Sequence, residues 1–381
     1  MFKPAAVFAL TLGIASIAGL DRPVAADVGP VTWTVNQRIA YGVRWYSGSF
    51  VNQNGPEVVN YVLANPTVAR VRPILSGGKA LGLTRTSTTA NTQAAAVAAV
   101  NGDMWGMGST APLGLHVQDG EVCVSGRHGI NQPPTRATLG IDSAGRLYVG
   151  NVQVRVRVDH PRGSLTTDQI NSARKADEVV LYTPRFAGST HTVGGVEVSL
   201  AVTGRLTMAG VLTGTVIGVS RTGNASLSGT CWVLSGTGLG AAKLAGLVPG
   251  TAVTLTSYNT AGGVWNTMSG AIGGDQFLVR GGSATPVVGA VHPRTSVGIR
   301  ADGRLMMVTV DGRQSGWSTG LTSMDMARLM LNLGAIDAVG CDGGGSTVMA
   351  VKKPGATLVS VVNRPSDGRE RAVTSSLVVL Q

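Results

Sequence analysis

The sequence predicts an α+β fold that is mostly β, with mixed sheets, a few packed helices and a β-rich insertion. Three observations lead to this prediction. The 381 residues include 54 glycines together with abundant valine and threonine; β-branched residues favour strands, and glycine favours the turns between them. Asp-Gly and Gly-Gly pairs recur beside short apolar runs, as in β-hairpins. Only two segments have a persuasive helical pattern.

The first 26 residues are predicted to be a signal peptide. A charged start precedes an apolar run over 5–20 and small residues at 24–26, which is the order of a secretory signal. We expect cleavage after Ala26 and a secreted, extracellular mature chain of residues 27–381. An uncleaved anchor is the alternative, but the run is somewhat short for a spanning helix of about 20 residues. No stable membrane span is therefore expected after cleavage.

The expected elements follow in chain order. An alanine-rich helix is predicted over roughly 91–99, leading into Asn101-Gly102-Asp103. Turn pairs between apolar runs predict three hairpins. These pair 115–117 with 121–124, 139–141 with 147–149, and 297–299 with 305–310.

Two further elements lie in the second half of the chain. Between about 187 and 263 the composition shifts to Val, Thr, Gly and Ser, which indicates a β-rich insertion packed on the main body. A helix is predicted to begin at Thr322-Ser323-Met324-Asp325, where an N-cap residue precedes an acid, and to end at Gly334. It leads into an apolar strand over 335–340.

That strand runs into Cys341-Asp342 and three glycines, followed by Ser346 and Thr347. Consecutive glycines expose backbone amides that can hold an anion such as phosphate. The alternative is a tight turn in which aspartate is only a turn former. The loop is not a nucleotide P-loop, because it lacks the lysine and is followed by a predicted strand over 347–351.

The charge of the chain favours an anionic partner. The formal net charge is +11, and removing Lys3, Arg22 and Asp21 with the signal peptide leaves 29 basic minus 19 acidic residues, or +10. Most of the basic residues are arginine, which binds planar oxyanions through two donors. The basic residues are scattered and aromatics make up 4%, so we expect no nucleic acid partner. A wall polymer or sugar phosphate suits the sequence better.

Cysteine and histidine provide little chemistry. The three cysteines form no CxxC pair; Cys123 with Cys231 is the more favoured disulfide if one forms, since Cys341 is expected to be buried. The five histidines lack metal-ligand spacing, so no metal and no cofactor are expected. The chain also lacks a Gly-x-Ser-x-Gly elbow, an HExxH motif and a recognisable Cys/His dyad.

Four other polar segments lie beside predicted strands. They are Asn101-Gly102-Asp103, His292-Pro293-Arg294-Thr295, Asp311-Gly312-Arg313-Gln314 and the stretch 363–371. Each has a structural alternative: a turn for Asn101-Gly102-Asp103 and for Asp311-Gly312, a surface arginine for Arg294 and a solvated loop for 363–371.

Taken in order with the glycine turn, these segments resemble the phosphodiester glycosidase family. The similarity covers about residue 41 to the C-terminus, and Asp342 to Ser346 and Arg294-Thr295-x-x-Gly298 are its most specific parts. Met104 and Cys341 depart from the usual family residues, and 187–263 has no motif to compare. The resemblance implies hydrolysis of sugar-1-phosphodiesters, such as those of N-acetylglucosamine. With the predicted export, cell-wall or extracellular glycans are the expected substrates.

Cleavage at the anomeric C–O bond needs a base or nucleophile and a stabilised phosphate. We predict that Asp342 and Asp103 are the catalytic carboxylates. The predicted substrate-binding and phosphate-binding residues are Arg294, Thr295, Asn101, Gly102, Gly343, Gly344, Gly345, Ser346, Thr347, Asp311, Arg313, Ser366, Asp367 and Arg371. A non-catalytic module that binds anionic glycopolymers and a phosphodiesterase that cleaves the P–O bond are the alternatives. The sequence makes no prediction of anomer or oligomeric state.

Overall fold

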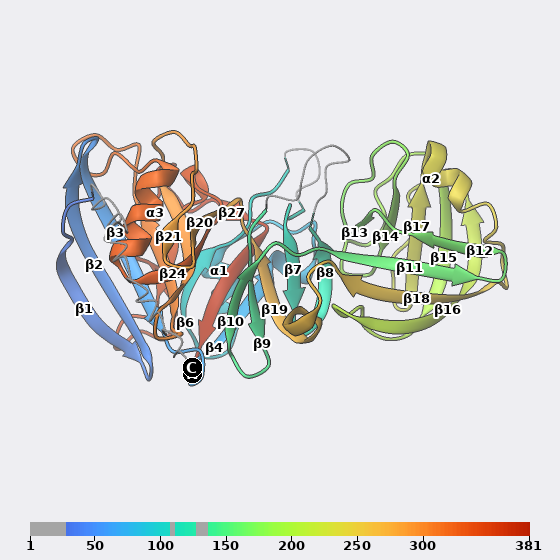
Figure 1. Cartoon of the computed structure of the whole chain (residues 1–381), viewed down its shortest axis with the longest axis horizontal. Helices are drawn as coiled ribbons and strands as arrows, with labels where there is room; N and C mark the ends of the chain where they lie inside the picture. The colour runs from blue at the N-terminus through green and yellow to red at the C-terminus, as the bar shows by residue number, and fades with distance from the viewer. Residues whose placement is uncertain (1–27, 107–110, 127–135) are drawn as a thin grey trace, which may run out of the picture.

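The computed structural model describes residues 28–106, 111–126 and 136–381, and the predicted signal peptide lies outside this range. The protein is built mainly from four β-sheets, with short helices on their faces (Figure 1). The predicted class, mostly β with a few packed helices, is confirmed. Within the described residues the strand pairs are antiparallel, apart from the parallel pair β13 and β14.

The first sheet has eight strands and carries α3 (Ser323–Asn332) on one face. Its strands, in spatial order, are β1 (Thr32–Ala40), β2 (Val43–Asn52), β3 (Gly55–Ala64), β23 (Leu305–Val310), β22 (Arg294–Arg300), β24 (Ala335–Gly340), β20 (Gln276–Arg280) and β21 (Ser283–Ala284).

The second and third sheets have five strands each and form the middle of the molecule (Figure 1). The second contains β26 (Ser360–Val361), β25 (Met349–Val351), β6 (Ala96–Asn101), β28 (Ser375–Leu380) and β4 (Arg70–Leu75). The third contains β10 (Leu147–Gly150), β9 (Thr138–Asp142), β19 (Met268–Gly273), β7 (Leu115–Gln118) and β8 (Glu121–Ser125).

The fourth sheet lies at the end of the molecule opposite α3 (Figure 1) and spans part of the chain upstream of 187–263 as well as most of that stretch. Its strands are β12 (Gly163–Thr166), β11 (Val154–His160), β18 (Ala252–Asn259), β16 (Gly210–Ser220), β15 (Val196–Val202), β17 (Cys231–Gly236), β14 (Val179–Tyr182) and β13 (Gln169–Ile170). The remaining elements are the ribbon of β27 (Ala372–Val373) with β5 (Thr84–Arg85), α1 (Thr86–Asn91), α2 (Gly238–Lys243) and three single-turn helices, η1 (Ser76–Gly78), η2 (Gly263–Thr267) and η3 (Gly344–Ser346).

Apolar layers join these sheets. One cluster packs the first sheet against the second and third sheets, with Val62 on one side and Val100 and Ile141 on the other. Another packs the third sheet against the fourth through residues such as Val117 and Leu255. Burial of such side chains is the main favourable contribution to folding. Separate apolar clusters therefore fill the layers from α3 to the fourth sheet.

The predicted helix at 322–334 is confirmed. The Thr322 hydroxyl accepts a hydrogen bond from the Asp325 amide at 3.0 Å, which is an N-cap interaction. Met326 and Met330 are buried against the first sheet. Gly334 follows the helix with φ of +95°, a conformation that glycine adopts without strain.

The helix predicted at 91–99 is wrong. The helix α1 ends at Asn91, Ala95 has φ of +62°, and β6 follows at once. All six residues of β6 are buried, because the strand pairs with β25 and β28 in the middle of the second sheet. There its small side chains suit close packing, and tertiary context outweighs the helix propensity of alanine.

The three predicted hairpins are confirmed as β7–β8, β9–β10 and β22–β23. The strand predicted after the glycine turn is β25. Cys123, Cys231 and Cys341 are free cysteines, so the pair favoured by the sequence does not form in this structure. No helix within the described residues has the length and apolar character needed to cross a membrane.

Candidate active site

The predicted site residues gather where strands of the first and second sheets end. β22 lies between β23 and β24; Arg294 is opposite Val310, and Ser296 is opposite Gly340. The start of β22 is therefore adjacent to the ends of both neighbours, after which Asp311 and Asp342 follow. Asn101 ends β6 in the second sheet.

Asn101 joins the two sheets at this point. Its side-chain amide donates to the Asp342 carbonyl at 2.7 Å. Its side-chain oxygen accepts from the Thr295 hydroxyl at 2.7 Å and from the Val348 amide at 3.1 Å. Asn101 is fully buried, so these bonds hold the glycine turn against β6 and β22.

Gly102 permits a close approach between β6 and its neighbours. Its amide donates to the Ser375 carbonyl at 2.9 Å, and its own carbonyl accepts from the Asp342 amide at 3.0 Å. A Cβ at Gly102 would lie 2.5 Å from the Ser375 hydroxyl and 2.6 Å from the Ile272 side chain. Only glycine fits here without displacing those groups.

Asp103 is buried, with 1% of its surface exposed. One carboxylate oxygen forms an ion pair with Arg136 at 2.8 Å, and the other accepts a hydrogen bond from the Gly114 amide. The Asp103 amide donates to the Ser375 hydroxyl at 3.2 Å. A Cβ at Gly114 or Gly273 would lie 2.8 or 2.9 Å from the carboxylate, so two glycines make room for this acid.

Asp342 has an altered proton affinity. Burial raises the pKa of Asp342 to about 6; a hydrogen bond with Ser346 opposes the rise, the negative charge of Asp103 adds to it and the positive charge of Arg371 opposes it. Burial and a like charge both disfavour the ionised carboxylate. The two predicted catalytic acids are therefore within electrostatic reach of each other.

The glycine turn is a single helical turn, η3, held by backbone hydrogen bonds within itself and to the residue before β22. The Gly344 amide donates to the Pro293 carbonyl at 2.9 Å, and the Ser346 amide donates to the Gly343 carbonyl at 3.3 Å. Gly344 has φ of +62°, a backbone conformation that glycine adopts freely and that is unfavourable for a residue with a side chain. Two of the amides predicted to bind phosphate are thus already hydrogen-bonded within the protein.

Arg371 and Arg313 lie against the glycine turn. Arg371 donates to Asp367 at 2.9 Å and to the Ser346 hydroxyl at 3.4 Å, and a Cβ at Gly345 would lie 2.0 Å from its guanidinium. A Cβ at Gly344 would lie 3.0 Å from the guanidinium of Arg313. The turn therefore has two cationic groups in contact with it.

Arg294 is held differently. Its guanidinium donates to the Leu321 carbonyl at 2.9 Å and to the Ala290 carbonyl, both in the segments flanking α3 and β22. Burial lowers the pKa of Arg294. Its side chain still passes close to the turn, since a Cβ at Gly343 would lie 3.9 Å from its Cδ.

Asp311 ties together two loops beside the site. Its carboxylate accepts hydrogen bonds from the Trp317 indole at 3.0 Å, the Asn363 amide group at 3.0 Å and the Arg364 backbone amide at 3.0 Å. Burial raises the pKa of Asp311. These contacts suit a residue that positions Arg313 and the 363–371 loop.

The hydroxyls of Thr347 and Ser366 are buried without a hydrogen-bond partner in the described structure. Burying such a group unpaired costs about 1–3 kcal/mol. Both residues belong to the segments around Asp342 and Arg371.

Sequence reasoning missed Arg136, Gly114, Gly273 and Ser375. Arg136 lies 33 positions from Asp103, and nothing in its neighbours marks it as an acid's partner. The two glycines are unremarkable in a chain with 54 of them. Gly114 precedes β7 and Gly273 ends β19. Their shared role beside the Asp103 carboxylate can be recognised only once these two strands are known to be adjacent.

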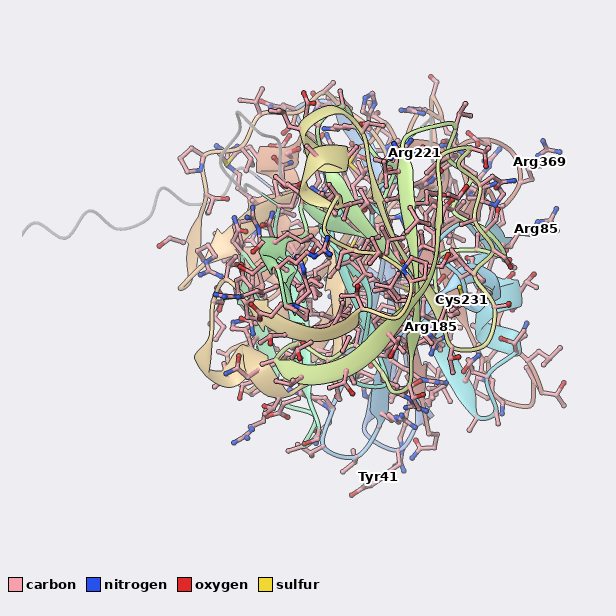
Figure 2. The ribbon with its side chains drawn as sticks, turned by 90° about the vertical axis from the view of Figure 1, so that its right-hand side faces the viewer. Tyr41, Arg85, Arg185, Arg221, Cys231 and Arg369 are labelled. Atoms are coloured by element: carbon pink, nitrogen blue, oxygen red, sulfur yellow. The ribbon has the colours of Figure 1, made fainter. Side chains whose placement is uncertain are left out.

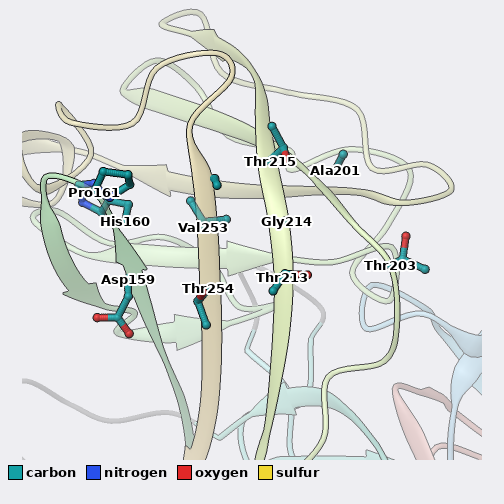
Figure 3. A pocket seen from close by; sticks show the side chains of 11 residues that line it. Asp159, His160, Pro161, Ala201, Thr203, Thr213, Gly214, Thr215, Val253 and Thr254 are labelled. Atoms are coloured by element: carbon teal, nitrogen blue, oxygen red, sulfur yellow. The ribbon is translucent and has the colours of Figure 1, made fainter.

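The described residues contain no group of three or more His, Cys, Asp or Glu side chains placed to hold a metal ion. A cavity of about 670 Å³ lies elsewhere, on the fourth sheet. Figure 3 shows Thr213, Thr215 and Thr254 on its strands, with Asp159 and His160 at one side. None of the predicted site residues lines it.

A model of the phosphodiester glycosidase family matches residues 197–380. The chain carries a domain of the phosphodiester glycosidase family. The matched range contains Arg294, Asp342 and Arg371, whereas Asp103 and Arg136 precede it. The resemblance inferred from the motifs is therefore confirmed.

Other comparisons are consistent with this domain. The SPbeta prophage-derived uncharacterized protein YomE of Bacillus subtilis is 46% identical over 88 residues, a match that spans 23% of this chain and 13% of that relative. A hypothetical protein from Synechocystis has a TM-score of 0.74 at 18% identity, covering 93% of this chain and 65% of its own. A candidate exported protein of Burkholderia pseudomallei has a TM-score of 0.66 at 22% identity, covering 86% and 74%. At these identities the two structures show the fold alone.

Proposed function

We propose that this phosphodiester glycosidase domain hydrolyses sugar-1-phosphodiesters at the bond between the anomeric carbon and the phosphate oxygen. The observation that carries the proposal is that the Asp342 amide donates to the carbonyl of Gly102, the residue before Asp103, at 3.0 Å, beside a glycine turn contacted by Arg313 and Arg371. This arrangement supplies a carboxylate for the sugar and positive charge for the phosphate.

The environments of the two acids suggest different roles. Asp103 faces Arg136 in an ion pair, and in the proposed mechanism its negative charge stabilises an oxocarbenium-like transition state. Asp342, whose pKa is raised to about 6, takes a proton from the attacking water. A base works best when its pKa lies near the working pH. The proton released by water therefore ends on Asp342, and the sugar acquires the hydroxyl.

The leaving group is a phosphate monoester, which departs without prior protonation more readily than an alcohol does. Arg313 and Arg371 stabilise the charge that develops on it, and Arg294 adds a positive field behind the turn. Loss of a preorganised donor at such a position typically costs about 3 kcal/mol of transition-state stabilisation.

Substrates in extracellular or cell-wall glycans are part of the proposal. The signal-like order of residues 1–26 and the strongly basic mature chain support it. N-terminal sequencing of the secreted protein should begin at Asp27 or within a few residues. A mature protein that retains Met1 would reject export with cleavage.

The decisive experiment is hydrolysis of UDP-N-acetylglucosamine and of simple sugar-1-phosphodiesters in ¹⁸O-labelled water. Cleavage at the anomeric carbon places the label on the sugar. Label on the phosphate would show P–O cleavage instead, and binding without turnover would indicate a glycopolymer-binding module. We expect a chelator to leave the rate largely unchanged.

A further inference from the structure

A second polar groove lies on the first sheet, away from the candidate active site. It has a volume of about 420 Å³, and its lining includes Arg38, Arg44, Asn65 and Arg304. The volume is within the range of pockets that hold small ligands, about 300–1,000 Å³. None of its lining residues belongs to the predicted site.

The groove carries an excess of positive charge. Arg38 and Arg44 are opposite each other in the pairing of β1 with β2, so their side chains share one face of the sheet. Arg44 donates to the Asn36 side chain, and the Arg38 guanidinium lies 5.7 Å from the centre of the Tyr41 ring. Within the described residues, neither arginine has a carboxylate partner.

The other side of the groove is only partly neutralised. The Asp302 carboxylate forms an ion pair with Arg304 at 2.5 Å and lies 3.8 Å from the guanidinium of Arg300. Two arginines therefore share one carboxylate. The lining of the groove itself therefore holds three arginines, Arg38, Arg44 and Arg304, and one carboxylate, Asp302.

An aromatic cluster lies next to these arginines. The rings of Trp33 and Tyr46 are 5.5 Å apart, and those of Tyr46 and Tyr61 are 5.3 Å apart and stacked. Tyr46 is two residues beyond Arg44 on β2, so both point to the same face. The buried Tyr61 hydroxyl has no hydrogen-bond partner in the described structure. Arginine binds phosphate through two donors, and aromatic rings present an apolar surface with a polar edge.

We propose that this groove binds a phosphate-bearing segment of an anionic glycan chain, at a distance from the site that cleaves it. The proposal rests on the proposed function for its choice of ligand, a chain with repeated sugar-1-phosphodiester links. The groove holds the chain and does not react with it. Its one carboxylate, Asp302, is engaged by two arginines.

The groove and the active site lie at opposite ends of β23. Arg304 precedes this strand, Asp311 follows it, and the strand has six residues. At about 3.3 Å per residue the two ends are roughly 20 Å apart. Figure 2 shows Tyr41, beside the groove, at the lower edge of the molecule and Arg369, in the loop beside the active site, in the upper half. One chain several units long can contact both places, which raises its effective concentration at the active site.

The test measures binding of poly(N-acetylglucosamine-1-phosphate) by titration calorimetry, using full-length protein with Asp342→Asn to prevent cleavage. Adding Arg38→Gln and Arg44→Gln should weaken binding about tenfold and reduce the slope of log affinity against log salt by about two. The matched control adds Arg205→Gln and Arg221→Gln, which remove the same charge from exposed positions in the fourth-sheet part of the chain. The control should retain its affinity within about twofold.

A second measurement separates this proposal from the proposed function. With Asp342 intact, Arg38→Gln/Arg44→Gln should turn over UDP-N-acetylglucosamine at the wild-type rate. Loss of polymer binding on adding Arg38→Gln and Arg44→Gln would support glycan binding in the groove even if the wild-type protein hydrolysed nothing. An equal loss of polymer affinity in the Arg205→Gln/Arg221→Gln control, or unchanged affinity in the Arg38→Gln/Arg44→Gln variant, would overturn the proposal that the groove binds the glycan. A single-stranded oligonucleotide that bound as tightly, with the same loss, would reject a glycan as its ligand.

Discussion

At Asp342 the environment favours the protonated acid, whereas the proposed chemistry needs the ionised one. Burial and the charge of Asp103 raise the pKa to about 6 from an ordinary value near 4. The folded protein therefore binds this proton more tightly than the unfolded chain does. The contribution of this group to stability falls as pH rises from about 4 to 6, and the deficit persists above that range.

Replacing Asp342 with asparagine should abolish turnover and stabilise the protein at pH 8, because the change removes a buried charge and keeps the shape. The stability gain should be on the order of 1–3 kcal/mol, measured by denaturant unfolding. Asp337→Asn is the control, since Asp337 lies on β24, the strand that precedes Asp342, with its carboxylate 3.9 Å from Arg280. Activity of Asp342→Asn within about threefold of wild type, less than 1 kcal/mol of barrier, would remove Asp342 from the catalytic residues.

The pH dependence of kcat/KM gives a separate test of the role of Asp342. If Asp342 is the base, the rate should rise from acid pH through about 6 and then level off, because only the ionised carboxylate accepts the proton. A rate that falls across the same range would assign Asp342 as an acid instead.

At the scale of elements, the glycine turn fixes the position of a cation. A Cβ at Gly345 would lie 2.0 Å from the Arg371 guanidinium and 2.3 Å from the Asp367 carboxylate. Both atoms belong to the ends of flexible side chains, so the fold can yield while Arg371 is displaced.

Gly345→Ala should therefore reduce kcat/KM by about a hundredfold, the effect of losing a donor at the transition state, with a small change in melting temperature. Gly218→Ala on β16 is the matched control, since a Cβ there meets nothing within 4 Å. Steady-state kinetics and thermal unfolding of both variants make the comparison. Full activity in Gly345→Ala would show that the position of Arg371 does not contribute to catalysis.

Elements with local signals were predictable, and those determined by neighbours were not. The helix at 322–334 has its cap, periodicity and terminal glycine within the segment itself. Residues 96–100 carry alanines that favour a helix, and only the flanking β25 and β28 make them a strand. Asp103 and Asp342 could be selected because each follows a strand beside glycine. Arg136 could not, because its pairing with Asp103 depends on how the second and third sheets pack.

At the scale of the whole molecule, the fourth sheet shares its core with the third. Leu115, Val117 and Met268 from the third sheet pack in one cluster with residues such as Val156 and Leu255 of the fourth. Separating the fourth sheet from the third would expose the apolar surfaces of both to water, at a free-energy cost of about 25 cal/mol per Å².

We therefore expect a single cooperative unfolding transition in differential scanning calorimetry, with the calorimetric and van't Hoff enthalpies equal. Two resolved transitions would show that the fourth sheet unfolds as an independent unit. Intrinsic fluorescence gives a second probe, since Trp45 lies in the core next to the first sheet and Trp232 in the core next to the fourth.

The side chain of Asn101 has a consequence for motion. It bonds to both ends of the glycine turn, at the Asp342 carbonyl and the Val348 amide, and to the Thr295 hydroxyl on β22, so separating either segment leaves a buried polar group unpaired. Local opening at this junction is therefore costly, and the Asp342 and Val348 amides should exchange with deuterium only as fast as the whole protein unfolds. The acid and its turn are then in place before substrate arrives, and turnover does not wait for these strands to close.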